Sequence, residues 1–288
     1  MKILISALLF AVQVAKIHAA GYFGYGLPVY LDQNTNTIEH YSPALPEPIR
    51  SHSHGNSFAN SLKSSINANY PGIYVNRVDH RDAAVTYNFL VNDGSIQSYE
   101  MIFYSGHGKI GASGDNTGNE AAFVTYEHGF VRPSSKTYGT WNRWVFTDFC
   151  QFLRNHNPYF YQNMFGGLHA VFGYESNMYF YIYGYDCFPW GCGGHDRSED
   201  KWIPFGPNWA KPNGKKMWDD YKDINLYEQY VVGHSSNAPA VVYNAYIGWQ
   251  GASIFLGHTE YITNIFNGDV PIGTLKHEYV INGTPTYN

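Results

Sequence analysis

The chain has 288 residues, of which 14% are charged and 18% aromatic, and its formal net charge is −5. Such a composition excludes a disordered chain, because disorder goes with few aromatic residues and high net charge. It also argues against a nucleic-acid partner, because the sequence has no excess of basic residues.

The first twenty residues, "MKILISALLFAVQVAKIHAA", have the pattern of a secretory signal peptide. Lys2 provides a basic start, an apolar core follows, and Ala19 and Ala20 are small residues suited to cleavage. The alternative is an uncleaved membrane anchor, but the apolar core is short for a span. The sequence therefore predicts a secreted, extracellular protein without a membrane segment after cleavage, in which residues 21–288 form a single domain with an irregular N-terminal segment.

The pattern of apolar residues along the chain alternates between strand-like and helix-like segments. The predicted segments are an irregular stretch at 21–48, an amphipathic helix at 81–94, a buried strand at 100–104, a strand at 143–150, a helical start at 151–165 broken by Pro158, a strand at 167–176, a helix at 215–231, a strand at 238–249 and an edge or antiparallel strand within 252–266. Strands separated by helices indicate a mostly parallel sheet covered on both faces. The predicted fold class is an α/β three-layer sandwich.

Two reactive side chains follow the ends of the first two predicted strands. The first strand runs into Ser105, Gly106, His107 and Gly108, and the second ends at Cys150. In parallel sheets, ligands and reacting groups collect at the carboxyl ends of the strands. If the two strands are parallel neighbours, His107 and Cys150 emerge at the same edge.

A thiol and an imidazole at one sheet edge are the parts of a cysteine peptidase. Cys150 supplies a nucleophile, His107 a base, and the backbone N–H groups of Gly108 and Cys150 an oxyanion hole. Peptide hydrolysis by this pair needs no metal and no cofactor. The alternative reading of Cys150 is a small buried core residue, which is common for a thiol outside a disulfide.

The segments "FYSGHG" and "FTDFC" resemble the two motifs of the caspase, legumain and gingipain group of cysteine peptidases. The resemblance covers about residues 70–255 and implies a caspase-like sheet. It also implies His107 as acid/base, Cys150 as nucleophile, and Gly108 with Cys150 as the oxyanion hole. The partner would be a peptide or protein substrate.

By position, Glu175 and Ser176, after the third strand, are candidates for a substrate pocket. The alternative function is a catalytically inactive, caspase-like secreted protein that uses its Tyr-rich loops for binding or adhesion. Phe149 bears on this choice, because it stands where these peptidases usually carry a small residue.

Three cysteines in a secreted protein leave one thiol over. Cys187 and Cys192 lie close together in "DCFPWGCGG", where Pro189 and Gly191 favour a tight turn, and are predicted to form a disulfide. Cys150 is then the remaining thiol. A disulfide from Cys150 to either of the others would exclude it as a nucleophile.

Other motifs are weaker. "GHSSN" around Ser235 is similar to a nucleophile elbow, but it ends in Asn237 and no helix follows. His52, His54 and His195 fit no established metal-binding spacing, so no metal site is predicted. His169 lies within a strand and is interpreted as a core histidine with its hydrogen bonds satisfied.

Overall fold

A computed structural model describes the following residues: 21–26, 61, 64–65, 68–69, 76–81, 85–99, 101–105, 108–110, 121–125, 130–139, 142–148, 150–176, 183–188, 191–196, 214–232, 238–248, 254–261, 271–281 and 284–287. For some strand and helix residues, the backbone alone is described. The predicted signal peptide lies outside these residues. Among the described helices, none is long and apolar enough to cross a membrane.

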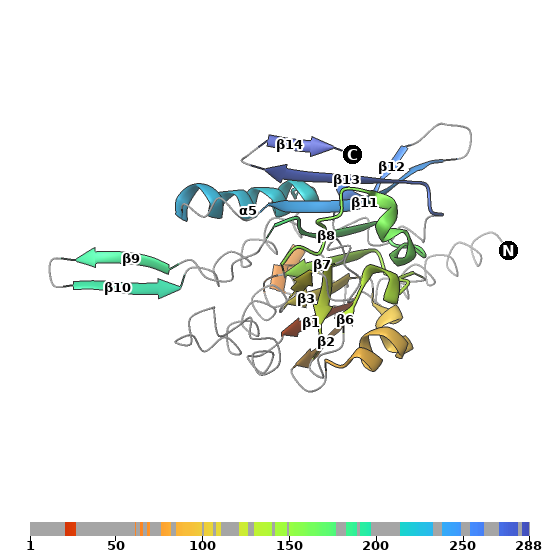
Figure 1. Ribbon diagram of the computed structural model, residues 1–288, viewed down its shortest axis with the longest axis horizontal. Coiled ribbons are helices and arrows are strands. Elements are labelled where there is room, and N and C mark those ends of the chain that lie inside the picture. Colours follow the sequence, from red (N-terminus) through yellow and green to blue (C-terminus); the bar gives the residue numbers. More distant parts are fainter. Residues whose placement is uncertain are drawn as a thin grey trace.

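A nine-stranded mixed sheet forms the centre of the fold (Figure 1), with the strand order β14-β13-β11-β8-β7-β3-β1-β2 and with β12 paired to β11. Its strands are β1 (Gly21–Gly26), β2 (Asn76–Arg81), β3 (Met101–Ser105), β7 (Trp144–Asp148), β8 (Ala170–Tyr174), β11 (Pro239–Ile247), β12 (Ile254–Leu256), β13 (Thr274–Ile281) and β14 (Thr284–Tyr287). The predicted α/β class is confirmed.

Two smaller sheets and several helices complete the described structure. The strands are β4 (Gly108–Ile110), β5 (Ala121–Val124) and β6 (Phe130–Val131) in one sheet, and β9 (Tyr183–Phe188) and β10 (Gly191–Asp196) in the other. The helices are α5 (Met217–Val232) and the short segments η3 (Asn88–Asn92), η4 (Gly94–Ser98), η5 (Pro133–Ser135), η6 (Pro158–Met164) and η9 (Gly257–Thr259). In Figure 1, the β9–β10 hairpin projects away from the central sheet.

The expectation of a mostly parallel sheet is wrong. Within the described central sheet, four strand pairings are parallel, from β2 to β8. Four others, around β11 and β13, are antiparallel. For β13 and β14 the reason is a short connection, because only Asn282 and Gly283 separate them. A two-residue link can join only antiparallel strands, whereas a parallel pair needs a long crossover.

The sheet is covered on both faces. On one face, Trp218 and Tyr221 of α5 pack against Phe172 of β8, with ring centroids 6.4 and 5.6 Å apart. On the other face, Leu90 of η3 and Ile96 of η4 are buried in one core with β3 and β7 residues. Side chains of a strand alternate between faces, so all of β8 is buried.

Several local expectations need correction. Of the helix expected at 81–94, Arg81 belongs to β2 and Asn88–Asn92 form η3, while residues 82–84 lie outside the described residues. Pro158 begins η6 instead of breaking a helix: Asn157 accepts a hydrogen bond from the Tyr159 N–H, and a proline fits the first helical position, where no N–H is needed. Residues 21–26, expected to be irregular, form β1.

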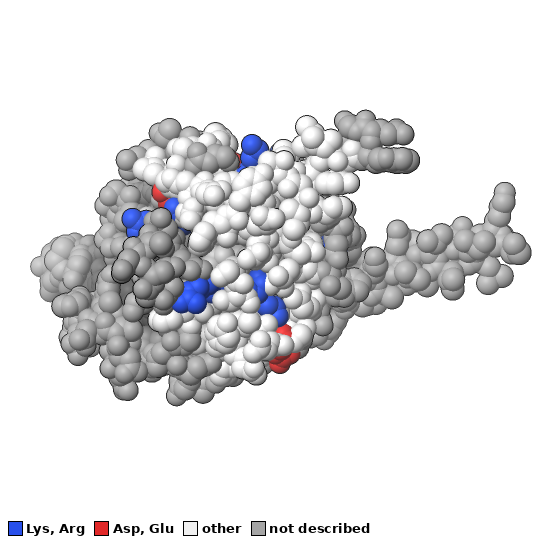
Figure 2. Space-filling model, turned by 45° about the vertical axis from the view of Figure 1, so that its right-hand side comes forward, with Lys and Arg blue, Asp and Glu red and all other residues white. Residues whose placement is uncertain are grey.

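Charged side chains are sparse among the described residues on one face of the molecule (Figure 2). On the face shown in Figure 2, the described Lys, Arg, Asp and Glu residues are few and scattered among uncharged ones. Several large apolar side chains are exposed, including Ile247 and Ile254, which are direct partners in the β11–β12 pairing.

Candidate functional site at the carboxyl edge of β3 and β7

The register of β3 and β7 brings the two sequence motifs to the same sheet edge. These strands are parallel neighbours, and Ser105 at the end of β3 pairs with Asp148 at the end of β7. His107 and Cys150 each follow this pair by two residues in the chain. The predicted parallel pairing is therefore confirmed. The placement of His107 itself lies outside the described residues, as does that of Phe149.

Cys150 is a partly exposed thiol and begins the turn that follows β7, residues 150–153, which we call the Cys150 turn. The next residue, Gln151, has a φ of 58°, which makes it the one non-glycine residue with positive φ in the described chain. The left-handed region is uncommon for non-glycine residues and marks a position worth functional scrutiny. The chain thus reverses sharply immediately after the candidate nucleophile.

Gly108, the predicted oxyanion-hole residue, begins β4 and is paired with Phe123 of β5. It therefore lies where the chain leaves the β3 edge and enters the small β4-β5-β6 sheet. Its role as a hydrogen-bond donor to a substrate stays a prediction.

Glu175 and Ser176, the predicted pocket residues, follow β8 and contact the Cys150 turn. The Ser176 carbonyl accepts a hydrogen bond from the Gln151 N–H at 2.9 Å, and the Ser176 hydroxyl accepts one from the Ala238 N–H at 2.7 Å. The Glu175 carboxylate lies 2.6 Å from Nε2 of His156. Ser176 is therefore bonded to the residue after Cys150, and Glu175 to a residue six positions after it, while their role in substrate binding stays a prediction.

His156 is a site residue that sequence reasoning missed. It follows Cys150 by six residues in a loop without a motif. Glu175 directly follows the end of β8, but His156 comes eight residues after Asp148, the end of β7, so its position carried no strand-end signal.

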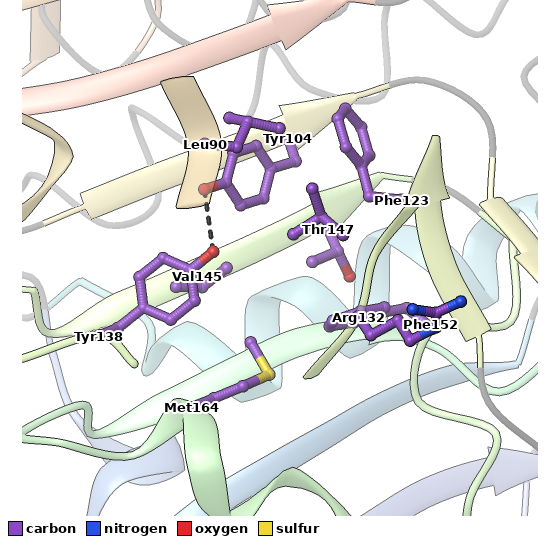
Figure 3. Close-up of a pocket in the computed structure, with 10 residues that line it drawn as sticks. Leu90, Tyr104, Phe123, Arg132, Tyr138, Val145, Thr147, Phe152 and Met164 are labelled. Atoms are coloured by element: carbon purple, nitrogen blue, oxygen red, sulfur yellow. Dashed lines mark hydrogen bonds between the residues drawn. The ribbon is translucent and has the colours of Figure 1, made fainter. Parts of the chain in front are cut away.

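A small cavity lies beneath this edge, on the face of the sheet that η3 and η4 cover (Figure 3). It is lined from β3 by Tyr104, from β7 by Thr147 and from the Cys150 turn by Phe152. The hydroxyls of Tyr104 and Tyr138 are hydrogen-bonded at 3.0 Å, and burial raises the pKa of Tyr138 to about 12. The cavity volume of about 10 Å³ corresponds to one water molecule at most, so it cannot receive a substrate side chain.

The close packing beside the turn depends on a glycine in β8. A Cβ added at Gly173 would clash with the hydroxyl oxygen of Thr147 and lie 3.3 Å from Cγ of Leu153. Thr147 donates its own hydrogen bond to the Phe172 carbonyl at 2.9 Å. A side chain at position 173 would therefore require Thr147 to move and would crowd Leu153.

Cys187 and Cys192 are directly opposite each other in the antiparallel pairing of β9 and β10. Opposed residues in antiparallel strands have Cα atoms about 4.5 to 5.5 Å apart, and disulfides span Cα distances of about 4.4 to 6.8 Å. The backbone register therefore suits the predicted bond. Their side chains are not among those described, so the bond stays a prediction.

The structure gives no support for a functional site at the remaining candidate residues that it describes. His169 is fully buried, and its Nδ1 lies 2.8 Å from the Glu260 carboxylate, which confirms the interpretation as a hydrogen-bonded core histidine. In the part of the chain that the structure describes, no cluster of three or more potential metal-ligating side chains occurs. Ser235, His52 and His54 lie outside the described residues, and for His195 only the backbone is described.

Comparison with known proteins gives one match among solved structures to report. The crystal structure of the Drosophila initiator caspase Dronc matches over 85% of this chain and 85% of that chain, with a TM-score of 0.40 and 10% sequence identity. The match is to a caspase, the group that the two motifs resemble. A likeness at this level carries no information on activity. No family model and no curated protein matches the sequence.

Proposed function

We propose that this chain is a secreted cysteine endopeptidase that acts through Cys150 and His107. The observation that carries the proposal is the register of β3 and β7, in which the strand ends before His107 and Cys150 are paired. The fold of the sheet does not itself require a thiol and an imidazole two residues after the paired ends of neighbouring parallel strands. The partial exposure of Cys150 also suits a reactive thiol better than a core cysteine.

The proposed reaction is acyl transfer. The Cys150 thiolate attacks the carbonyl carbon of the scissile peptide bond, and backbone N–H groups of Gly108 and Cys150 stabilise the resulting oxyanion. His107 carries the proton from the thiol to the leaving amine, and the acyl-enzyme forms as the C–N bond breaks. Water then hydrolyses the thioester and restores the thiol. The chemistry requires no metal and no organic cofactor.

The proposal is tested by the reactivity of Cys150 across pH. The mature protein is treated with iodoacetamide between pH 4 and 10, and the modified residue is mapped by mass spectrometry, with Cys150→Ala and His107→Ala run in parallel. We expect Cys150 to react at a pH well below the ordinary thiol pKa of about 8.5. His107→Ala should shift that profile upward, because the imidazolium that stabilises the thiolate is lost.

An ordinary thiol profile, unchanged in His107→Ala, would refute the peptidase proposal. The binding or adhesive function of the same fold would then replace it. If the profile is shifted as expected, cleavage of a peptide library by the wild-type protein but not by Cys150→Ala completes the test.

A further inference from the structure

The backbone conformation of the turn after Cys150 is unfavourable by itself and needs stabilising contacts. Gln151 is in the left-handed region, with a φ of 58°. Non-glycine residues persist there only when their surroundings over-determine the conformation. The contacts that hold this turn therefore decide where the preceding thiol points.

Two backbone hydrogen bonds join the turn to the end of β8. The Gln151 N–H donates to the Ser176 carbonyl at 2.9 Å, and the Leu153 N–H donates to the Tyr174 carbonyl at 3.0 Å. A third hydrogen bond comes from Tyr161 of η6, whose hydroxyl donates to the Phe152 carbonyl at 3.0 Å. The turn is thus held from both sides along its first three residues.

The next contact along the chain joins the side chains of His156 and Glu175. Nε2 of His156 lies 2.6 Å from Oε1 of Glu175, and the exposed fractions of the two side chains are 48% and 13%. The His156 ring is stacked on Tyr279 of β13, with centroids 4.6 Å apart and ring planes at 10°. Glu175 is itself fixed to β11, because its N–H donates to the Ala238 carbonyl at 2.9 Å.

We infer that His156 and Glu175 are positioning residues for Cys150, which clamp the left-handed turn against the end of β8 and so hold the thiol at the sheet edge. This inference rests on the proposed function, because it assigns the pair a role in the reactivity of that thiol. Neither side chain is required to touch the substrate. The pair acts by keeping the chain after Cys150 against β8, which stabilises the Gln151–Ser176 and Leu153–Tyr174 hydrogen bonds.

The test uses variants that distinguish the loss of the His156–Glu175 hydrogen bond from the loss of the Glu175 charge. Glu175→Ala removes the acceptor, and His156→Phe removes the bond but keeps a ring to stack on Tyr279. Glu175→Gln removes the charge and keeps an oxygen that accepts from Nε2–H. Asp223→Ala is the matched control, because it breaks an exposed ion pair, 2.9 Å long, between Asp223 of α5 and Lys215 just before that helix.

Two quantities are measured in each variant: amide hydrogen exchange at Gln151 and Leu153, and the rate constant of Cys150 alkylation. In Glu175→Ala and His156→Phe, we expect the two amides to exchange about fivefold faster and the thiol to react about fivefold slower, the size expected of a half-exposed pair. Glu175→Gln should restore most of both. Asp223→Ala should change neither, and amides of α5 should keep their protection in all variants.

The inference is overturned if Glu175→Ala and His156→Phe leave the alkylation rate at the wild-type value, whether or not the amides change. It is also overturned if Glu175→Gln is as impaired as Glu175→Ala, because the charge and not the position would then be responsible. An ordinary thiol profile in the wild-type protein refutes the peptidase proposal alone. In that case, the alkylation rates of Glu175→Ala and His156→Phe relative to the wild-type protein still decide the positioning inference.

Discussion

Gln151 links the local backbone to the candidate chemistry at the scale of a single residue. It has a positive φ, and its N–H is used to attach the chain to Ser176. A residue without a Cβ would adopt this conformation at no steric cost. The sequence has glutamine here, so the folded state bears a cost that is compensated by the hydrogen bonds of the turn.

This cost gives a prediction at position 151. Gln151→Gly should stabilise the protein by up to about 1 kcal/mol, because relief of the left-handed strain exceeds the added freedom of the unfolded chain. Gln151→Val should destabilise it by about 1 kcal/mol or more, because a β-branched side chain tolerates positive φ least. Urea unfolding midpoints of the three proteins measure the order.

The matched control for this prediction is Gln162→Gly. Gln162 is exposed in η6, where glycine has no conformational advantage. That change should destabilise the protein, as glycine does in helices. Equal losses in Gln151→Gly and Gln162→Gly would show that the turn at 151 stores no strain.

At the scale of elements, β13 carries buried titratable groups on both of its faces. His277 lies on one face, 1% exposed, with Tyr161, Tyr279 and His156 as ring neighbours. Glu278 lies on the other, where its carboxylate accepts a hydrogen bond from the Trp218 indole at 2.7 Å. Burial lowers the pKa of His277 to about 3 and raises that of Glu278.

The lowered pKa of His277 predicts a loss of stability in acid. The folded state keeps His277 neutral, whereas the unfolded chain protonates it below a pH of about 6.5. The contribution is therefore complete above that pH and is lost as the pH falls toward 3. Between pH 7 and 5, the loss from this one group is about 2 kcal/mol.

His277→Phe tests this prediction, because phenylalanine keeps an aromatic ring and cannot titrate. We expect the free energy of unfolding of the variant to fall less between pH 7 and 5 than that of the wild type, by about 2 kcal/mol. Denaturant unfolding at a series of pH values gives the comparison. Parallel curves for the two proteins would mean that the pKa of His277 is the same in the folded and unfolded states.

At the scale of the whole molecule, the sequence combines a predicted signal peptide with a hairpin that pairs Cys187 and Cys192. These features agree, because disulfides form in the oxidising compartments that secreted proteins pass through. The same compartment must leave Cys150 reduced if it is the nucleophile. Its attachment to the end of β8 and its distance in the chain from the hairpin favour that division of the three cysteines.

Expression of the full chain in a secreting cell tests both features together. We expect a secreted product that begins at Gly21, after cleavage at Ala20, and whose non-reduced digest contains a peptide with Cys187 bonded to Cys192. Its mass should lack the two thiol hydrogens. Cys150 should be recovered as a thiol, and a bond from Cys150 to either hairpin cysteine would contradict the peptidase proposal.

The sequence alone determined the elements that carry a strong local signal. The buried strands β3, β7, β8 and β11 and the helix α5 were predicted close to their observed bounds, since long apolar runs and helical periodicity depend on neighbours in the chain. The motif residues at two strand ends followed from the same patterns. The strands β13 and β14 were missed, although Asn282-Gly283 between them is a typical hairpin link.

Tertiary structure decided the features that depend on contacts between distant residues. The antiparallel half of the sheet, the position of the glycine-rich β1 between β3 and β2, and the pairing of His156 with Glu175 are of this kind. Their stabilisation comes from partners far along the chain, so no local window of sequence contains the energy that selects them. The positive φ of Gln151 belongs to the same class, because contacts with the end of β8 compensate for a conformation that glutamine by itself disfavours.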